Sequence, residues 1–323
     1  MKQFLSAFLE TAIESIVNGI KVSAFHHGRS RFRHRLNILF ERLRPNAITE
    51  PQSLTCALYQ RPTKDGEQLL AYLLRQPIRD VTALLASNRA HNSGLERSRN
   101  IIYSQSLVRQ YCSKILIPQH EDYLILERDD PRSRIVVSFH FGDFIYGCAK
   151  LFTLGSNARR KFVLSLNNSS SACYSNLLAG FGSEAPRPET ELPLLQTSTA
   201  RLSELLRAGN TSILLFCDLP PGLGEGTQVR LLNRVVCFSI GPAILAIANK
   251  VPILPLINFS NGEHNYVYLG RQIEPELMGS ESLRIGARRI TQELASFFEA
   301  VFVSYPEQWR FVSLLERYQV SPG

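Results

Sequence analysis

Short apolar runs separated by helical stretches make up most of the chain after residue 120. Six runs are expected to form strands: Tyr123–Leu126, Ile135–Phe139, Phe162–Leu166, Ser212–Cys217, Val251–Ile257 and Tyr266–Leu269. Helical stretches lie between several of them, over Ala200–Arg207, Gly241–Asn249 and Ser282–Val301. Strands that alternate with helices are typical of a parallel sheet covered on both faces. The pattern therefore predicts an α/β fold with a mainly parallel central sheet flanked by helices.

The first 120 residues have a different, mostly helical pattern. Apolar side chains of residues 1–20 recur at steps of three and four, which predicts an amphipathic helix, and helical periodicity resumes over Gly66–Ala86 and Ser98–Ser113. We therefore expect a helical N-terminal region, residues 1–120, packed on an α/β domain, residues 121–323. The first helix can pack on the protein or lie in a membrane interface, and glutamates on its polar side favour packing.

Composition and cysteine usage narrow the class of protein. The chain of 323 residues is 44% hydrophobic, which favours a folded protein over a disordered one. Its six cysteines form no CxxC pair, so neither a zinc site nor a disulfide framework is indicated. The sequence has no uninterrupted apolar stretch of about 18 residues, so neither a membrane-spanning helix nor a signal peptide is expected. A cytoplasmic protein is expected, with peripheral contact at the inner face of the cytoplasmic membrane left open.

A basic cluster lies near the N-terminus and contributes to the formal net charge of +8. Such a cluster fits a solvated helix face, anionic lipid headgroups, an acidic protein partner or nucleic acid. The pattern disfavours nucleic acid as the partner, because no recognised binding motif accompanies the cluster. Peripheral membrane contact through residues 1–44 stays open. The cluster consists of His26, His27, Arg29, Arg31, Arg33, His34, Arg35, Arg42 and Arg44.

His140 is the first candidate for chemistry. It comes directly after the apolar run that ends at Phe139 and is followed by Phe141, Gly142 and Asp143. A histidine at the end of a buried strand can serve as a general base when a nearby carboxylate orients its ring. A single histidine beside an apolar run is more often structural, so the interpretation depends on the rest of the chain.

Four segments in order support a functional interpretation, although each alone fits a turn cap, a helix start or a packing anchor. They are His140-Phe-Gly-Asp143, Leu214-Leu-Phe-Cys-Asp218-Leu-Pro-Pro-Gly222, the Cys237–Pro255 stretch with Gly241-Pro242-Ala243, and Tyr305-Pro-Glu-Gln-Trp309-Arg-Phe311. Together they resemble the bacterial lipid A biosynthesis late acyltransferases, a branch of the lysophospholipid acyltransferase superfamily. The resemblance covers roughly Ser98 to Leu314.

The resemblance implies transfer of an acyl group from an acyl carrier protein or CoA thioester to a hydroxyl or amine, with His140 as general base. Phosphopantetheine belongs to the donor, and neither a separate cofactor nor a metal is implied. The family places an acid five residues after the histidine, where this chain has Ile145. Asp143 is the nearest acid, and on a helical turn it would share a face with His140. We therefore expect Asp143 as the catalytic partner, the alternative being a broken dyad.

Other roles also follow from the resemblance. Asp218 is expected to shape the substrate pocket, and Arg234 to bind phosphate or stabilise an oxyanion. Arg159 and Arg160 are available for phosphate groups on a lipid, on phosphopantetheine or on an acidic carrier protein. The expected partners are acyl carrier protein and an acyl lipid or small-molecule acceptor. Lipid A itself is not assigned as the substrate, because Asn167–Ser171 is neutral where basic residues would bind its phosphates.

Two other functions fit the same residues. A base-activated attack on a thioester does not dictate the nucleophile, so the protein can instead be a thioester hydrolase or act on a carrier-bound intermediate. With Ile145 in place of an acid, it can also be an inactive module that binds acyl chains or a carrier protein.

Overall fold

The computed structural model describes residues 64–75, 78–98, 114–117, 132–144, 147, 150, 161–164, 199–220, 225–232, 234–261 and 263–318. The chain separates into two compact units, Met1–Thr49 and Glu50–Gly323, and every described residue belongs to the second unit. The boundary expected near residue 120 stays a prediction. The helix expected over residues 1–20, the strand Tyr123–Leu126 and the basic cluster of residues 26–44 lie outside the described residues.

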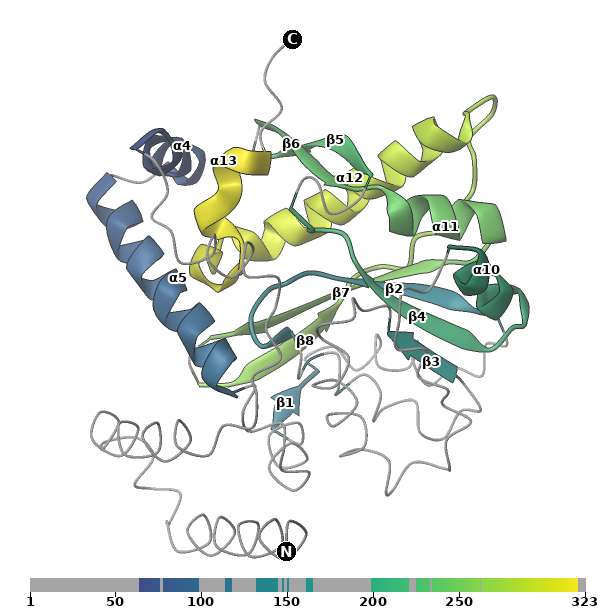
Figure 1. The fold of residues 1–323 in the computed structure, drawn as a ribbon, viewed down its shortest axis with the longest axis horizontal. Helices are drawn as coiled ribbons and strands as arrows, with labels where there is room; N and C mark the ends of the chain where they lie inside the picture. The colour runs from purple at the N-terminus through teal and green to yellow at the C-terminus, as the bar shows by residue number, and fades with distance from the viewer. Residues whose placement is uncertain are drawn as a thin grey trace, which may run out of the picture. The chain divides into compact units, whose positions relative to one another are not determined.

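A six-stranded sheet in the order β1-β8-β7-β2-β4-β3 forms the centre of this unit (Figure 1). Neighbouring strands run parallel except for β7 and β8, which are antiparallel. The predicted α/β class with a mainly parallel sheet is therefore confirmed. The strands are β1 (Ile115–Leu116), β2 (Arg134–Ser138), β3 (Lys161–Leu164), β4 (Thr211–Phe216), β7 (Ile253–Ser260) and β8 (Asn265–Leu269).

Strand β2 lies in the middle of the sheet, between β7 and β4. All five of its residues are buried, as expected for a strand covered on both faces. Its only charged residue, Arg134, donates a hydrogen bond from Nε to Ser212 Oγ on β4 at 3.1 Å. The apolar run that identified β2 in the sequence is thus the centre of the sheet.

A two-stranded antiparallel sheet, β5 (Gly226–Leu231) with β6 (Arg234–Ser239), was not expected from the sequence. The turn between its strands includes Leu232, whose φ of 50° is in the left-handed region. Helix α12 (Leu283–Phe302) packs on this hairpin, where Gln292 exchanges hydrogen bonds with the backbone of Arg230. The hairpin therefore extends the fold beyond the central sheet.

Helices α10 (Thr199–Arg207), α11 (Gly241–Asn249) and α12 (Leu283–Phe302) confirm the three helices predicted in this half of the chain. Pro242 stands in the first turn of α11, where its missing N–H has no helical partner to lose. Ser282 caps α12 by accepting a hydrogen bond from the backbone N–H of Ile285. Figure 1 shows α11 and α12 on the same side of the sheet.

Helices α4 (Lys64–Leu74) and α5 (Ile78–Ser98) replace the single stretch predicted over Gly66–Ala86. The sequence places Pro77 between them. Proline cannot donate the helical hydrogen bond and disfavours helical geometry in the residue before it, so it separates the two helices. None of the helices that the structure describes is long and apolar enough to cross a membrane.

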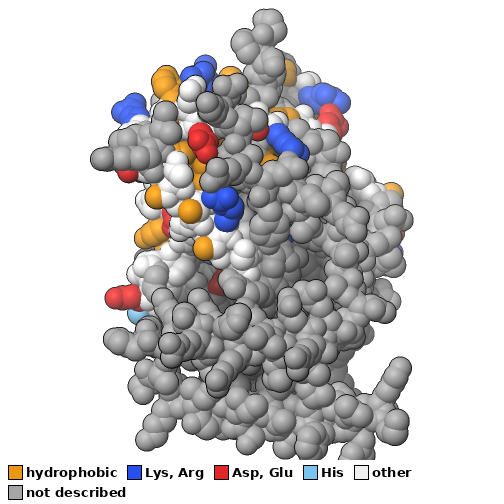
Figure 2. Space-filling model, turned by 60° about the vertical axis from the view of Figure 1, so that its left-hand side comes forward, with side chains coloured by type: hydrophobic (Ala, Val, Ile, Leu, Met, Phe, Trp, Pro, Cys, Tyr) orange, Lys and Arg blue, Asp and Glu red, His pale blue; other side chains and the backbone are white. Residues whose placement is uncertain are grey.

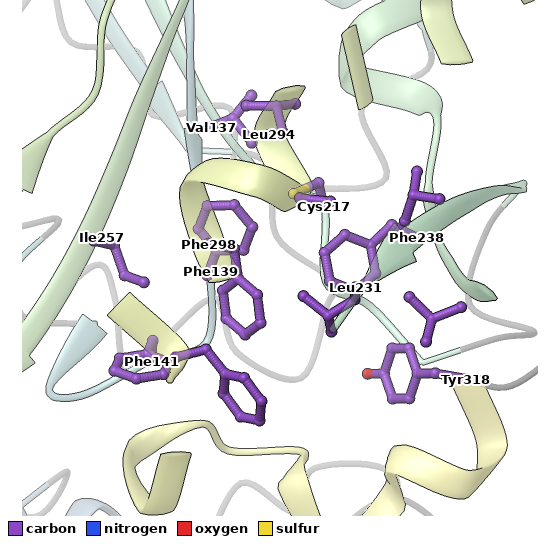
Figure 3. Close-up of a cluster of buried hydrophobic side chains, with 14 of the residues drawn as sticks. Val137, Phe139, Phe141, Cys217, Leu231, Phe238, Ile257, Leu294, Phe298 and Tyr318 are labelled. Carbon is purple, nitrogen blue, oxygen red and sulfur yellow. The ribbon is translucent and has the colours of Figure 1, made fainter. Parts of the chain in front are cut away.

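Aromatic side chains fill the core between β2 and α12. Figure 3 shows Phe139, which follows β2, beside Phe298 of α12, and their ring centroids are 4.9 Å apart. The same Phe298 ring contacts Phe141 and Trp309 edge-on. Full burial of one such side chain contributes about 1.5–3 kcal/mol to folding. The core therefore joins the end of β2 to the segment that follows α12.

The segment after α12 consists of η3 (Pro306–Gln308), η4 (Val312–Leu314) and α13 (Leu315–Tyr318). Helix α5 holds it through side-chain amides. Asn88 Nδ2 donates to the carbonyl oxygens of Glu307 at 2.8 Å and Trp309 at 2.7 Å, and Asn92 Nδ2 donates to that of Arg310 at 3.1 Å. Helix α5, which belongs to the predicted N-terminal region, thus supports the segment that follows α12.

The described surface is mixed in character. On the face that Figure 2 displays, basic, acidic and hydrophobic side chains of the described residues are interspersed. This arrangement is ordinary for a protein surface, where apolar atoms are common.

Candidate active site

The carboxyl ends of β2 and β4 lie side by side and bring His140 and Asp218 together. In this parallel pair Arg134 is opposite Ser212 and Ser138 is opposite Phe216. His140 and Asp218 each come two residues after these strands, and they keep the same offset of 78 residues. Open parallel sheets place their ligands beyond the carboxyl ends of strands. The pair therefore lies where this architecture usually positions a functional site.

Asp218 holds His140 by two hydrogen bonds. The His140 ring nitrogen Nδ1 lies 2.9 Å from Asp218 Oδ1, and the His140 backbone N–H donates to Asp218 Oδ2 at 2.8 Å. An ionised carboxylate only accepts hydrogen bonds, so this contact assigns the ring hydrogen to Nδ1. The other ring nitrogen, Nε2, is then the atom that can accept a proton.

Two residues near the end of the chain complete the surroundings of Asp218. Trp309 Nε1 donates to Asp218 Oδ2 at 3.0 Å, and the Tyr318 hydroxyl donates to the Asp218 backbone carbonyl at 2.8 Å. Burial and the charge of Asp218 raise the pKa of Tyr318 well above its ordinary value, so this phenol stays protonated and remains a donor. The fully buried Asp218 carboxylate accepts three hydrogen bonds, two from His140 and one from Trp309. These bonds compensate for its removal from water.

Three phenylalanines surround the His140 ring. The ring centroids of Phe216, Phe144 and Phe311 lie 4.3 Å, 4.9 Å and 5.0 Å from that of the imidazole. The His140 side chain is still 15% exposed, whereas that of Asp218 is 0% exposed. The imidazole is thus anchored on its buried side, partly open on the other and bordered by apolar rings.

The backbone that follows His140 is fixed by the segment after α12. Arg310 N–H donates to the His140 carbonyl at 2.8 Å, and Gly142 N–H donates to the Gln308 carbonyl at 3.0 Å. Gly142 has a φ of 55°, and a Cβ at this position would lie 2.4 Å from the Asn258 carbonyl oxygen. Both the backbone conformation and the lack of space require glycine here.

This backbone path corrects the expected pairing of His140 with Asp143. The carboxylate hydrogen bonded to the His140 ring is that of Asp218, which the family resemblance implied to shape the substrate pocket. The expectation assumed a continuous helical turn after His140, but Phe141 forms an antiparallel bridge with Trp309 and Gly142 is left-handed. Residues 140 and 143 therefore do not share a helix face.

Asp143 instead lies near His91 of α5. Burial lowers the pKa of His91, while the charge of Asp143 and a hydrogen bond with the Gly142 backbone partly oppose that effect. Within the described part of the chain, His91 Nε2 is buried and has no hydrogen-bond partner. Neutral His91 and Asp143 thus form a second imidazole–carboxylate pair, close to the pair of His140 and Asp218.

Cys217, which precedes Asp218, is a poor candidate for a nucleophile. Burial and the neighbouring Asp218 charge raise the pKa of its thiol well above the ordinary value. Since the thiolate is the reactive form, this thiol is inert at neutral pH. The described residues also contain no group of three or more His, Cys, Asp or Glu side chains that could hold a metal ion.

The remaining predicted site residues are not brought to His140 by any described contact. The Arg234 guanidinium lies over the ring of Tyr72 on α4, with Cζ 4.5 Å from the ring centroid. Arg159 and Arg160 lie outside the described residues. Their roles in substrate binding stay predictions. The sequence did not identify Trp309 and Tyr318 as hydrogen-bond donors to Asp218. Trp309 was noticed only as part of an aromatic motif, and no sequence signal pointed to Tyr318.

Comparisons with known proteins add one structural likeness. No family model matches the chain, and no curated protein matches it. Among solved structures, the chain is similar to the 1-acyl-sn-glycerophosphate (LPA) acyltransferase PlsC from Thermotoga maritima, with 15% identity and a TM-score of 0.33. The match covers 64% of this chain and 82% of that one. A likeness at this level carries no argument, so the site is interpreted from its own geometry.

Proposed function

We propose that the protein is an acyltransferase that moves an acyl group from a thioester to a hydroxyl or amine, with His140 as general base and Asp218 as its orienting carboxylate. The supporting observation is the pair of hydrogen bonds that the ring and the backbone N–H of His140 donate to the buried Asp218 carboxylate. This contact leaves Nε2 available on a partly exposed ring. The motif resemblance supplies the reaction class.

In the proposed reaction, Nε2 of His140 takes the proton of the acceptor as its oxygen or nitrogen attacks the thioester carbonyl. A new C–O or C–N bond forms in a tetrahedral intermediate, whose collapse breaks the C–S bond. The imidazolium is stabilised by the Asp218 carboxylate and returns the proton to the leaving thiolate. Positioned proton transfer of this kind contributes about two to four orders of magnitude in rate.

The proposed donor is an acyl carrier protein or CoA thioester, and its phosphopantetheine arm is part of the substrate. Phe216, which is only partly buried and lies 4.3 Å from the His140 ring between ring centroids, supplies apolar surface against which an acyl chain can lie beside the reacting carbonyl. The proposed acceptor is an acyl lipid or a small molecule. Arg159, Arg160 and Arg234 are proposed to bind phosphate groups, and residues 1–44 to contact the cytoplasmic membrane surface.

The test is an acyl-transfer assay with acyl carrier protein and CoA thioesters, each with hydroxyl and amine acceptors, followed by mass spectrometry of every product. His140→Ala should lower the rate about a hundredfold to ten-thousandfold, because positioned proton transfer contributes an acceleration of this size. His264→Ala is the matched control, since His264 is an exposed histidine on the loop before β8. Full activity of His140→Ala would contradict the proposed mechanism.

The same assay separates the two other functions. Free acid formed at a catalytic rate from the donor alone would identify a thioester hydrolase. Donor binding without turnover in the unmodified protein would identify an inactive acyl-chain or carrier-protein binding module.

A further inference from the structure

We infer that Trp309 is a positioning residue of this site, which acts on His140 through Asp218. Its indole N–H holds the carboxylate so that Oδ1 keeps the hydrogen of His140 on Nδ1 and leaves Nε2 bare. This inference deepens the proposed acyl transfer and rests on it, because His140 is taken as the base.

The two carboxylate oxygens of Asp218 have different hydrogen-bond partners. Oδ2 accepts hydrogen bonds from Trp309 Nε1 and from the His140 backbone, and Oδ1 faces the His140 ring. With two donors fixed on Oδ2, rotation of the carboxylate would break at least one buried hydrogen bond. An unpaired donor in a buried site is costly. The indole therefore determines which oxygen faces the imidazole and in which plane.

Trp309 is itself held rigidly. Its side chain is fully buried, and its ring packs edge-on against Phe298 and Phe302 at centroid distances of 5.4 Å and 5.5 Å. Asn88 Nδ2 on α5 donates to the Trp309 carbonyl at 2.7 Å. A donor fixed in advance needs no reorganisation when charge develops on the neighbouring ring.

The same short segment also holds the other member of the pair. Arg310, the residue after Trp309, donates its backbone N–H to the His140 carbonyl at 2.8 Å. Phe141, the residue after His140, forms an antiparallel bridge with Trp309. His140 and Asp218 therefore share one support, and a displacement of residues 309–310 would disturb both.

Packing alone accounts for a large aromatic ring at position 309 but not for an N–H directed at a carboxylate. The two explanations differ in one atom. A ring of the same shape without the N–H should preserve the core and lose the positioning, whereas a purely structural tryptophan would tolerate the exchange.

The chain contains one tryptophan, so an analogue incorporated in place of tryptophan changes position 309 alone. In β-(3-benzothienyl)alanine, sulfur replaces the N–H and the bicyclic shape is kept. We expect kcat to fall about tenfold or more, as for the loss of a hydrogen bond to a charged group, with little change in KM. Because 5-fluorotryptophan retains the N–H, it should restore kcat. Trp309→Phe is the genetically encoded companion.

A second readout needs no substrate. Nitrogen-15 chemical shifts of the His140 ring report which nitrogen carries the hydrogen, and His140→Gln identifies the signals. The unmodified protein should show hydrogen on Nδ1 and a bare Nε2, and the benzothienyl protein should show a mixture of both tautomers. Equal kcat and an unchanged tautomer in the benzothienyl protein would overturn the inference.

The two readouts separate the inference from the proposed function. A tautomer that depends on the indole N–H, in a protein that transfers no acyl group, would retain the positioning role and reject the reaction. Activity that requires His140 but survives the loss of the N–H, with the tautomer unchanged, would retain the reaction and reject the role of Trp309.

Discussion

Two imidazole–carboxylate pairs lie near the segment that follows β2, and they differ in the hydrogen bonds that their histidine rings make. His140 is hydrogen bonded to Asp218, and its ring is partly exposed. His91 lies near Asp143, and its Nε2 is buried without a hydrogen-bond partner among the described residues. The first arrangement can accept a proton and stabilise the resulting charge, whereas burial disfavours charge on the second.

This difference shows that distance along the chain is a poor guide to function here. Asp143 is three residues from His140, but Asp218 makes the contact from 78 residues away. Asp218 takes the place expected for Asp143 because the backbone turns at Gly142 and because β2 and β4 are neighbouring strands.

The largest effect is expected when the two aspartates are compared. Asp218→Asn should lower kcat about a hundredfold to ten-thousandfold, because an amide can donate to Nδ1 and stabilise the tautomer whose Nε2 cannot accept a proton. Asp143→Asn should lower kcat only a few-fold. Both variants are measured by steady-state kinetics at one pH. A greater loss in Asp143→Asn would restore the pairing expected from the sequence.

A smaller effect is expected in the support that α5 gives to the site. Asn88→Ala removes the donor to the carbonyls of Glu307 and Trp309. We expect a loss of about 1–3 kcal/mol in the free energy of unfolding, together with a several-fold lower kcat. Urea denaturation and kinetics measure the two effects. Asn261→Ala, in an exposed turn, serves as the control, and an equal change in both variants would count against a specific support.

The smallest effect is expected in the pH dependence of stability. Because the pKa of His91 is lowered in the folded protein, the unfolded chain binds more protons at this residue below the ordinary value of 6.5. The stability contributed by neutral His91 is therefore present above this value and lost as the pH falls through the folded pKa. His91→Gln should flatten the curve of unfolding free energy between about pH 5 and pH 7. A steeper curve in the variant would show that His91 is charged when folded.

The main strands and helices could be predicted because their signals are local. The apolar run of β2 and the Gly-Pro start of α11 appear in short windows of sequence. Strand β6 has the short apolar run Val235–Phe238, but strand β5 was missed because its residues largely alternate between exposed and buried instead of forming an apolar run. Its signal was a period of two, which a search for continuous apolar runs passes over.

The site could be predicted only in part for the same physical reason. His140 was recognised from its position at a strand end, which is a local property. Its pairing with Asp218 depends on which strands are neighbours, and the order of elements along the chain does not determine that. The direction of the Trp309 N–H is likewise a tertiary property, since it follows from packing between α12 and the residues after it.

The shared register of β2 and β4 also affects how related sites should be sought in other sequences. Lengthening or shortening the connection between the strands would alter the number of intervening residues without moving either side chain. One residue inserted within β2 or β4 would turn the alternating side chains to the opposite face. Divergent relatives should therefore be recognised by a histidine and an aspartate that each end a buried strand, whatever the length of sequence between them.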